Sequence, residues 1–389
     1  MQKRRKIAVV TTSRADYGHL YWPLREMETH PEIDLQLIAM GAHLSPEFGD
    51  TVTEIERDGF SVARRVECLL SSDSDVGMAK TIGVAALGLA DVLGEMRPDL
   101  LLLIADRYEL MAPASVALAL RIPIAHIEGG DISEGAVDEA VRHALTKISH
   151  LHFTPTEKAE RRVLAMGEER WRVLRTGAPS LDHLRRRKLW EREALSRELD
   201  LDLARPTAVV AYHPVTLHAA DTLLEADALF ESLSSLPLQI AFCFPNADAG
   251  SRSLIRRAEA FCREKAQARL FVNLNHLKYW SLLRHSAIML GNSSSGIMET
   301  PSLELPTVNI GIRQQGRERA RNIVDAPADP AAIARAVETA SSPAFRAALA
   351  GMTNPYGDGR ASERILRRIL EAPLGEKLLM KRTVFPGID

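Results

Sequence analysis

The stretch Leu100–Ala105 (LLLLIA), followed at once by Asp106-Arg107-Tyr108-Glu109, decides the fold class. A continuous apolar run leaves no polar face for solvent, so it predicts a strand buried on both faces. Such strands are typical of the centre of a parallel sheet that is covered by helices on each side. Polar residues directly after the strand then lie at its carboxyl end, where parallel α/β sheets bind ligands.

Outward from this strand, short β-rich runs alternate with helical stretches along both halves of the chain. In the first half the predicted strands are Ile7–Thr12, Leu35–Met40, Leu100–Ala105, Pro123–Ile127, Leu151–Pro155 and Val173–Thr176, and the predicted helices are Val76–Met96, Tyr108–Leu120 and Asp138–Ile148. In the second half the predicted strands are Thr207–Tyr212, Leu238–Phe244, Leu270–Leu274, Ala287–Leu290 and Thr307–Ile310. Predicted helices lie between them at Ala220–Ser232, Ser251–Lys265, Lys278–Arg284, Ile297–Leu303 and Asp329–Ala340.

The alternation is interrupted between Gly177 and Arg205, where a charged helical stretch, Leu184–Leu199, stands alone. At roughly 150 residues per domain, 389 residues favour two domains. We therefore expect an α/β fold of two doubly wound Rossmann-type domains with a cleft between them. The expected ranges are 1–180 and 181–365, with a helix and tail at 366–389 for which packing on either domain stays open.

The composition excludes several classes of protein. Lys and Arg total 49 and Asp and Glu total 51, so the net charge is 49 − 51 = −2. A strongly positive surface for nucleic acid or an anionic membrane is therefore not expected. The three cysteines, Cys68, Cys243 and Cys262, are far apart and form no CxxC, which fits a reducing cytoplasm. No uncharged apolar run reaches the ~18 residues of a membrane span, and no signal peptide is expected.

Four loops after predicted strands carry chemistry. The first, Thr11–Tyr17, contains Arg14, which could hold a phosphate, although Ser13 could instead simply cap a helix and leave Arg14 solvated. The chain contains neither GxGxxG nor GxxxxGK[ST], so a nicotinamide site and a P-loop both lose their main support. The second loop places Asp106 at the sheet edge, where its alternative role is to cap the next helix.

The third loop is the most acidic. Glu128 ends a strand and is followed by two glycines, which would let a ligand approach closely. Asp138 and Arg142 follow at i, i+4 spacing, which puts them on one side of the predicted helix. So many acidic groups in one segment favour a functional site over packing alone.

The fourth loop, Gly291–Gly296, leads from a strand through small polar residues into a helix, which is typical of an anion site. Arg313 follows the next strand and could be a second clamp on a phosphate. His213 and Asn246 follow two further strands and belong to the same edge. The pair His150 and His152 is not expected to bind a metal, because no third ligand lies nearby in the sequence.

Together these loops make the chain resemble the hydrolysing UDP-N-acetylglucosamine 2-epimerases, which feed sialic acid and related nonulosonic acid synthesis. The matching stretches, between about residues 6 and 370, are Ser13–Tyr17, Gly77–Thr81, Asp106–Glu109, His126–Gly130, Val137–His143, His213–Thr216, Asn246–Ser251 and Gly291–Arg313. The non-hydrolysing relatives carry Pro-Glu, Gly-Asp-Thr and Glu-Ala-Gly at three of these places, so the hydrolysing branch is favoured. The resemblance implies a GT-B-like fold.

The resemblance also implies roles for individual residues. The diphosphate would be held by Arg14, Arg107, Ser293, Ser294 and Arg313. Glu299 would hold the ribose, and Asn246 would lie near the nucleotide. The catalytic residues would be Asp106, Glu128, Asp138 and His213. No cofactor and no metal are implied.

The chemistry explains why carboxylates are wanted. The carbon C2 of the sugar has no adjacent carbonyl, so its proton is not acidic enough for direct abstraction and return. Elimination of UDP to a 2-acetamidoglucal, followed by hydration, inverts C2 without a nicotinamide. Our hypothesis is that Asp138 acts in elimination and that Asp106 and Glu128 act mainly in hydration.

Alternatives remain open at this point. The chain could act on UDP-N,N′-diacetylbacillosamine, on the legionaminic acid route, in place of UDP-N-acetylglucosamine. It could be a GT-B glycosyltransferase, which would need an acceptor, or a silent nucleotide-sugar sensor, which would not need three acids. A UDP-sugar is the expected partner, nucleic acid and membrane are not, and a cytoplasmic homo-oligomer (dimer or tetramer) is expected.

Overall fold

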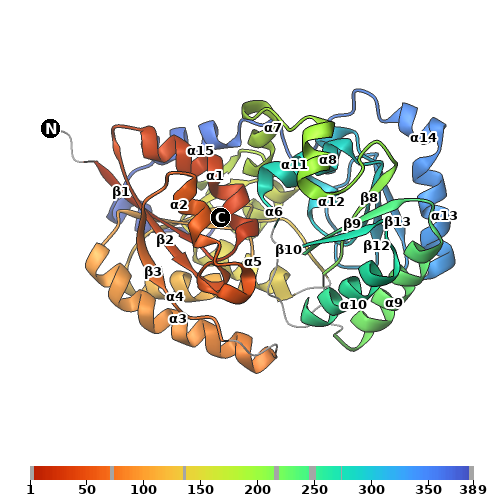
Figure 1. Ribbon diagram of the computed structural model, residues 1–389. Coiled ribbons are helices and arrows are strands. Elements are labelled where there is room, and N and C mark those ends of the chain that lie inside the picture. The colour runs from red at the N-terminus through yellow and green to blue at the C-terminus, as the bar shows by residue number, and fades with distance from the viewer. Residues whose placement is uncertain are drawn as a thin grey trace. The chain divides into compact units, whose positions relative to one another are not determined.

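The computed structural model describes residues 4–70, 74–134, 137–213, 219–244, 251–272 and 274–384 (Figure 1). The chain divides into two compact units. Unit 1 comprises Met1–Asp131, Val137–His183 and Tyr356–Asp389, and unit 2 comprises Ile132–Ala136 and Leu184–Pro355. Each unit has one parallel sheet with helices on both faces, so the predicted pair of doubly wound α/β domains is confirmed.

Unit 1 is built on a seven-stranded sheet in the order β3-β2-β1-β4-β5-β6-β7. Its strands are β1 (Arg5–Thr11), β2 (Ile33–Met40), β3 (Val62–Val66), β4 (Leu100–Ile104), β5 (Ile124–Ile127), β6 (Leu151–Thr154) and β7 (Val173–Arg175). Every residue of β4 is buried, as the apolar run predicts. Strand order reverses between β1 and β4, which makes their carboxyl ends the switch point where such sheets bind ligands.

Helices cover both faces of this sheet (Figure 1). Tyr17 and Leu20 of one face pack with Ile365, whereas Ala85 and Leu89 pack on the other. The first face is covered by α1 (Arg14–Thr29), α2 (Val52–Arg57) and α15 (Ala361–Glu371). The second is covered by α3 (Asp75–Met96), α4 (Met111–Leu120) and α5 (Val137–Ile148). The other helices of unit 1 are α6 (Glu157–Ala165) and α16 (Glu376–Leu379), and α7 (Asp182–Arg186) spans the boundary between the two units.

Unit 2 repeats the arrangement with a six-stranded sheet in the order β10-β9-β8-β11-β12-β13. Its strands are β8 (Thr207–Ala211), β9 (Gln239–Phe244), β10 (Ala268–Val272), β11 (Ile288–Gly291), β12 (Thr307–Ile310) and β13 (Ile323–Ala326). Its helices are α8 (Arg192–Leu199), α9 (Ala219–Ser235), α10 (Ser251–Glu264), α11 (His276–His285), α12 (Ser295–Met298), α13 (Pro330–Ser341) and α14 (Pro343–Ala348). The switch point of this sheet lies between β8 and β11.

Three features differ from the sequence prediction. The edge strands β3 and β13 were not predicted, because β3 carries the exposed pair Arg64 and Arg65 and β13 is only partly buried and contains the exposed Asp325. The single helix expected at Leu184–Leu199 is two helices, α7 and α8. Residues 187–191, between α7 and α8, are not helical. In this segment the backbone N–H of Trp190 donates to the hydroxyl of Ser281 at 3.0 Å.

The helix α3 is the one helix of the described ranges that is long and apolar enough, by length and composition, to cross a membrane. The sequence prediction of no such segment rested on uncharged runs, and α3 contains charged residues such as Lys80 and Asp91. Its residues Ala85, Leu89 and Leu93 pack in the core of unit 1. The core of unit 1 therefore accounts for part of its apolar character, because 28% of the apolar window of α3 is buried.

A close backbone approach at the end of β11 requires glycine. Gly291 has φ +129°, and a Cβ built on it would collide with the backbone carbonyl of Ala211 in the neighbouring strand β8. The Cβ would be attached directly to the backbone of β11, and the carbonyl belongs to the backbone of β8, so neither strand can move aside without disturbing the sheet. The two strands that form the switch point of unit 2 can meet this closely only without a side chain at this position.

We expect Gly291→Ala to destabilise the protein by roughly 2–4 kcal/mol, because it combines a backbone clash with a strained φ. Gly83→Ala is the matched control, since Gly83 lies on the exposed face of α3 and an added Cβ meets nothing within 4 Å. That control should gain roughly 0.5–1 kcal/mol from helix propensity. Thermal denaturation of both variants measures the difference, and a wild-type melting temperature for Gly291→Ala would contradict the argument.

Candidate active site

The predicted site residues gather at the carboxyl ends of neighbouring strands in each unit. In unit 1 they follow β1, β4 and β5, which lie side by side in the sheet. In unit 2 they follow β8, β11 and β12, which are also neighbours. The exception is Asn246, which lies outside the described residues.

Asp16 organises the loop after β1. Its carboxylate accepts hydrogen bonds from Thr11 Oγ1 (3.0 Å), from the backbone N–H and hydroxyl of Thr12 (both 2.8 Å) and from the backbone N–H of Ser13 (2.8 Å). Behind it the buried His43 ring contacts Thr11 Oγ1 at 2.9 Å, and burial lowers the pKa of His43 to about 4. The loop is therefore held by a buried hydrogen-bond network and not by solvent.

Arg14 begins α1 but is not solvated, so the alternative of an exposed Arg14 is wrong. Its side chain is 9% exposed and forms an ion pair with Glu54 of α2 at 2.5 Å. Burial lowers the pKa of the guanidinium, and Glu54 opposes that shift. Because Glu54 already balances this charge, Arg14 could hold a diphosphate only by sharing or exchanging that partner.

Asp106 follows β4 through Ala105, which has the left-handed φ +60° that non-glycine residues rarely adopt. The Asp106 carboxylate forms an ion pair with Arg142 of α5, a buried side chain. The alternative role of Asp106 as a helix cap is not supported, because the residue before the following turn is Arg107. Arg107 itself donates twice to the buried Glu109, at 2.8 and 3.2 Å.

Glu128 follows β5 with the same unusual geometry. Its φ is +65°, its residue is 5% exposed, and its backbone N–H donates to the carbonyl of Phe153 at 2.8 Å. One carboxylate oxygen lies 2.9 Å from Nδ1 of His19. Sequence reasoning missed His19, because it lies within α1, far from Glu128 along the chain and outside every motif.

Asp138 lies in the first turn of α5, as predicted, and its residue is half-buried. Arg142 lies one turn later on the same helix, which is the spacing that the sequence predicted. Through Arg142, α5 contacts the loop after β4. Asp138 and Asp106 are therefore attached to one rigid assembly of helix and sheet in unit 1.

Asn292 holds the switch point of unit 2 together. Its side chain accepts the backbone N–H of His213 at 2.7 Å and donates to the carbonyl of His213 at 2.9 Å. Its own carbonyl accepts Arg313 at 3.2 Å and Gln314 at 2.7 Å. One buried residue thus connects the three loops after β8, β11 and β12. Asn292 lies within the stretch Gly291–Arg313 that the sequence analysis singled out, but this role was not predicted.

The polar turn after β11 carries Ser293, Ser294 and Glu299. The helix that it opens, α12, has only four residues, so its helix dipole is small. A phosphate at this turn would therefore be bound by backbone N–H groups and hydroxyls. Ser295 accepts from Tyr279 at 2.8 Å and donates to Glu299 at 2.5 Å. Glu299 is 6% exposed and therefore has a fixed orientation.

The two histidines that follow α5 serve the core. His150 Nδ1 accepts the backbone N–H of Ile124 at 3.1 Å, and His152 lies 3.0 Å from the buried Glu168. Lys147 and Lys381 also pair with Glu168, each at 2.8 Å. Over the ranges that the structure describes, no group of three or more His, Cys, Asp or Glu is arranged to hold a metal ion.

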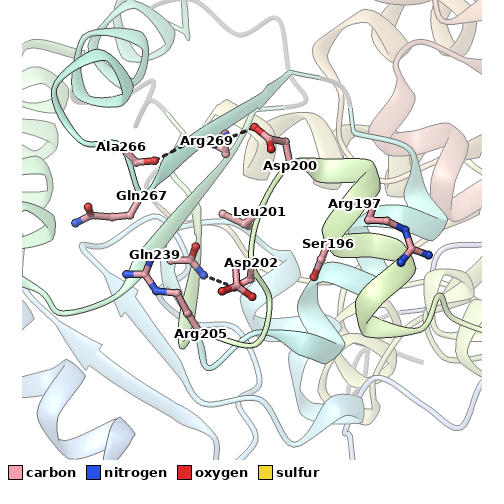
Figure 2. Close-up of a pocket in the computed structure, with 10 residues that line it drawn as sticks. All are labelled: Ser196, Arg197, Asp200, Leu201, Asp202, Arg205, Gln239, Ala266, Gln267 and Arg269. Atoms are coloured by element: carbon pink, nitrogen blue, oxygen red, sulfur yellow. Dashed lines mark hydrogen bonds and ion pairs between the residues drawn. The ribbon is translucent and has the colours of Figure 1, made fainter.

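A surface hollow of about 540 Å³ lies at the other end of the strands of unit 2. Figure 2 shows Arg205, Gln239 and Gln267, which stand before or at the start of β8, β9 and β10, among its lining residues. None of the predicted site residues lines it. Since parallel sheets bind ligands at their carboxyl ends, the loops described above remain the better candidates.

Comparisons with known proteins agree with this geometry. The family model described as UDP-N-acetylglucosamine 2-epimerase matches residues 25–370. The hydrolysing GDP/UDP-N,N′-diacetylbacillosamine 2-epimerase of Campylobacter jejuni is 36% identical over 83% of this chain and 84% of its own length. The hydrolysing UDP-N,N′-diacetylbacillosamine 2-epimerase of Legionella pneumophila is 35% identical over 97% of this chain and 98% of its own length.

Among solved structures, the Neisseria meningitidis UDP-GlcNAc 2-epimerase bound to UDP-GlcNAc matches with a TM-score of 0.80. The match covers 94% of this chain and 100% of that one, at 20% identity, and supports the GT-B-like fold. The chain belongs to the UDP-N-acetylglucosamine 2-epimerase family, on its hydrolysing branch. The resemblance inferred from the four loops is thereby confirmed.

We expect Asn292→Ala to destabilise unit 2 by roughly 2–4 kcal/mol, because it leaves two buried backbone groups of His213 without partners. Asn309→Ala is a suitable comparison, since Asn309 is also buried but, among the described residues, its side chain bonds Asp325 alone. Binding of UDP, measured by calorimetry, should weaken more for Asn292→Ala than for Asn309→Ala. Equal affinities in the two variants would argue against Asn292 as the residue that arranges the three loops.

Proposed function

We propose that the protein converts a UDP-activated 2-acetamido sugar and water into the free C2-epimer and UDP, with UDP-N,N′-diacetylbacillosamine as the favoured substrate. The observation that carries the proposal is the pairing of two carboxylates at neighbouring strand ends of unit 1. Asp106 is paired with Arg142, and Glu128 is paired with His19. Acids held in this way by basic partners suit proton transfers at one sugar ring.

Each unit would serve one part of the substrate. In unit 2, Ser293, Ser294 and Arg313 would bind the diphosphate, Glu299 the ribose and Asn246 the nucleotide. In unit 1, the carboxylates would act on the sugar. Arg14 and Arg107 would also contact the diphosphate, with each arginine dividing its hydrogen bonds between the diphosphate and its carboxylate partner, Glu54 or Glu109. The proposed assignment is residues 1–180 for catalysis and 181–365 for the nucleotide.

The reaction would begin by breaking two bonds. The C1–O bond to the diphosphate breaks as a carboxylate removes the C2 proton, which leaves a C1–C2 double bond and UDP. Hydroxyl and guanidinium donors would stabilise the negative charge on the departing diphosphate. Water then adds its oxygen to C1, and a proton is delivered to C2 from the opposite face, so the free sugar carries the inverted configuration.

The work would be divided among the acids. Asp138, on α5, would act in elimination, whereas Asp106 and Glu128 would act mainly in hydration. His213, buried after β8, would contact the sugar and the first phosphate. The roles follow from the resemblance to the family, and the division among the acids is our hypothesis. The reaction as written is balanced without a cofactor.

The favoured substrate follows from the relatives. Two proteins that are 35–36% identical over most of the chain are named for the diacetylbacillosamine substrate. The sequence expectation placed UDP-N-acetylglucosamine first, and it becomes the second candidate. The two sugars differ at C4 and C6, so the comparison tests which groups the site accepts.

We further propose a cytoplasmic homo-oligomer. An apolar surface on unit 1, formed by Val84 and Leu87 of α3 and Leu118 of α4, is exposed, with Leu87 76% exposed. Exposed apolar side chains on adjacent helices are typical of surfaces that bind another chain. A second copy of the protein would account for the exposed apolar side chains of α3.

Incubation with each UDP-sugar in D₂O, followed by proton NMR, tests the proposal. We expect free 2-epimerised sugar carrying deuterium at C2, together with UDP, and faster turnover of UDP-N,N′-diacetylbacillosamine. The deuterium arises because C2 is reprotonated from solvent. Turnover only with an added acceptor would indicate a glycosyltransferase, and no turnover of either sugar would refute the proposal.

In the same assay, Asp138→Asn should slow release of UDP by roughly 100- to 10,000-fold, as expected for loss of a general base. The substitution preserves shape, so the helix α5 should remain folded. Asp106→Asn should instead raise the proportion of free 2-acetamidoglucal among the products. Elimination at the wild-type rate in Asp138→Asn would overturn the division of roles.

A further inference from the structure

We propose that His19 is a positioning residue for the reaction, and that it acts by orienting the Glu128 carboxylate. The inference rests on the proposed function, because it assigns a role at the same site. The geometry that carries it is the 2.9 Å contact between His19 Nδ1 and Glu128 Oε1.

The two side chains have unequal access to solvent. The Glu128 side chain is 7% exposed and the His19 side chain is 22% exposed. Among the described residues, His19 is the one hydrogen-bond partner of the Glu128 carboxylate. Its second oxygen, Oε2, is therefore available to a ligand, while Oε1 is occupied by the imidazole.

The position of His19 is fixed by the helix that carries it. The backbone carbonyl of Gly18 accepts Nε2 of His183 at 2.9 Å, and His183 Nδ1 accepts the indole N–H of Trp22 at 3.1 Å. On the other side, the Tyr17 hydroxyl donates to Asp58 at 2.7 Å. The turn of α1 that contains His19 is thus held from two directions.

Glu128 is fixed from its own side as well. Its left-handed φ of +65° and its N–H bond to Phe153 set the direction in which the side chain leaves the sheet. A hydrogen bond from the imidazole to Oε1 then selects one rotamer of the Glu128 side chain. The pair lies at the carboxyl ends of the strands of unit 1, where the other site residues gather. A role for the imidazole at the site therefore explains its presence better than packing does.

The test is a double-mutant cycle of His19 and Glu128, measured with the UDP-sugar turnover assay described above. His19→Ala should lower kcat by about 10- to 100-fold, in the range of residues that orient a catalytic group, with little change in KM. It should also raise the fraction of free 2-acetamidoglucal, and we expect Glu128→Gln to do the same. In the Glu128→Gln background, His19→Ala should add less than about 3-fold, because the two residues act as a unit.

Two further variants separate orientation from folding. His19→Gln keeps an N–H donor and should retain more activity than His19→Ala. His30→Ala is the matched control, because His30 stands at the end of the same helix, where its ring accepts only the backbone N–H of Glu32. It should behave as wild type.

The outcomes distinguish this inference from the proposed function. If the wild-type protein is active, two results would overturn the role of His19 and leave the proposed function standing. One is an unchanged kcat in His19→Ala. The other is a double variant in which the losses of kcat from His19→Ala and Glu128→Gln multiply. Equal losses in His19→Ala and His19→Gln would also count against it. Absence of wild-type turnover would overturn both proposals.

Discussion

The left-handed backbone at Ala105 and Glu128 is the constraint on which the site of unit 1 depends. These residues end the neighbouring strands β4 and β5, and each costs roughly 1–2 kcal/mol in an L-residue. Sheet-edge hydrogen bonds offset the cost. Ala105 donates to the carbonyl of Ile127 at 2.9 Å, and its own carbonyl accepts His126 at 2.8 Å. Burial lowers the pKa of His126 to about 4, so the ring is neutral at physiological pH and serves as a plain donor. The turns direct Asp106 and Glu128 out of the sheet at one edge.

Charge in this protein is arranged in local pairs, which explains a net charge of only −2. In unit 1, Arg14, Arg107 and Arg142 each contact a carboxylate. A buried cation without such a partner would be costly, so the pairs allow arginines to stand beside acids within a folded core. In unit 2, Arg313 donates to the backbone carbonyl of Asn292 at 3.2 Å. The two sheets share the order of their first six strands, to which unit 1 adds β7.

Local patterns predicted the strands and the loops well, because the buried run of β4 and the polar residues after it are adjacent in sequence. They could not predict partners. Glu54 lies 40 residues from Arg14, and His19 lies 109 residues from Glu128, so both contacts exist only after the sheet has formed. The edge strands β3 and β13 escaped for a related reason, since pairing with a neighbour stabilises them more than their own composition does. Asn292 stood within a quoted motif, but its role needs the positions of three loops at once.

The arrangement of unit 1 along the chain has a consequence for biosynthesis. Its apolar core includes Ile365 and Ile369 of α15, whereas most of that core comes from residues before His183. All of unit 2 except a short segment is translated in between. Since chains emerge from the ribosome N-terminus first, the sheet that carries the carboxylates is made early but remains without one of its covering helices until α15 appears. Unit 2 ends at Pro355, before α15 is made, so it has all of its helices and strands before unit 1 does.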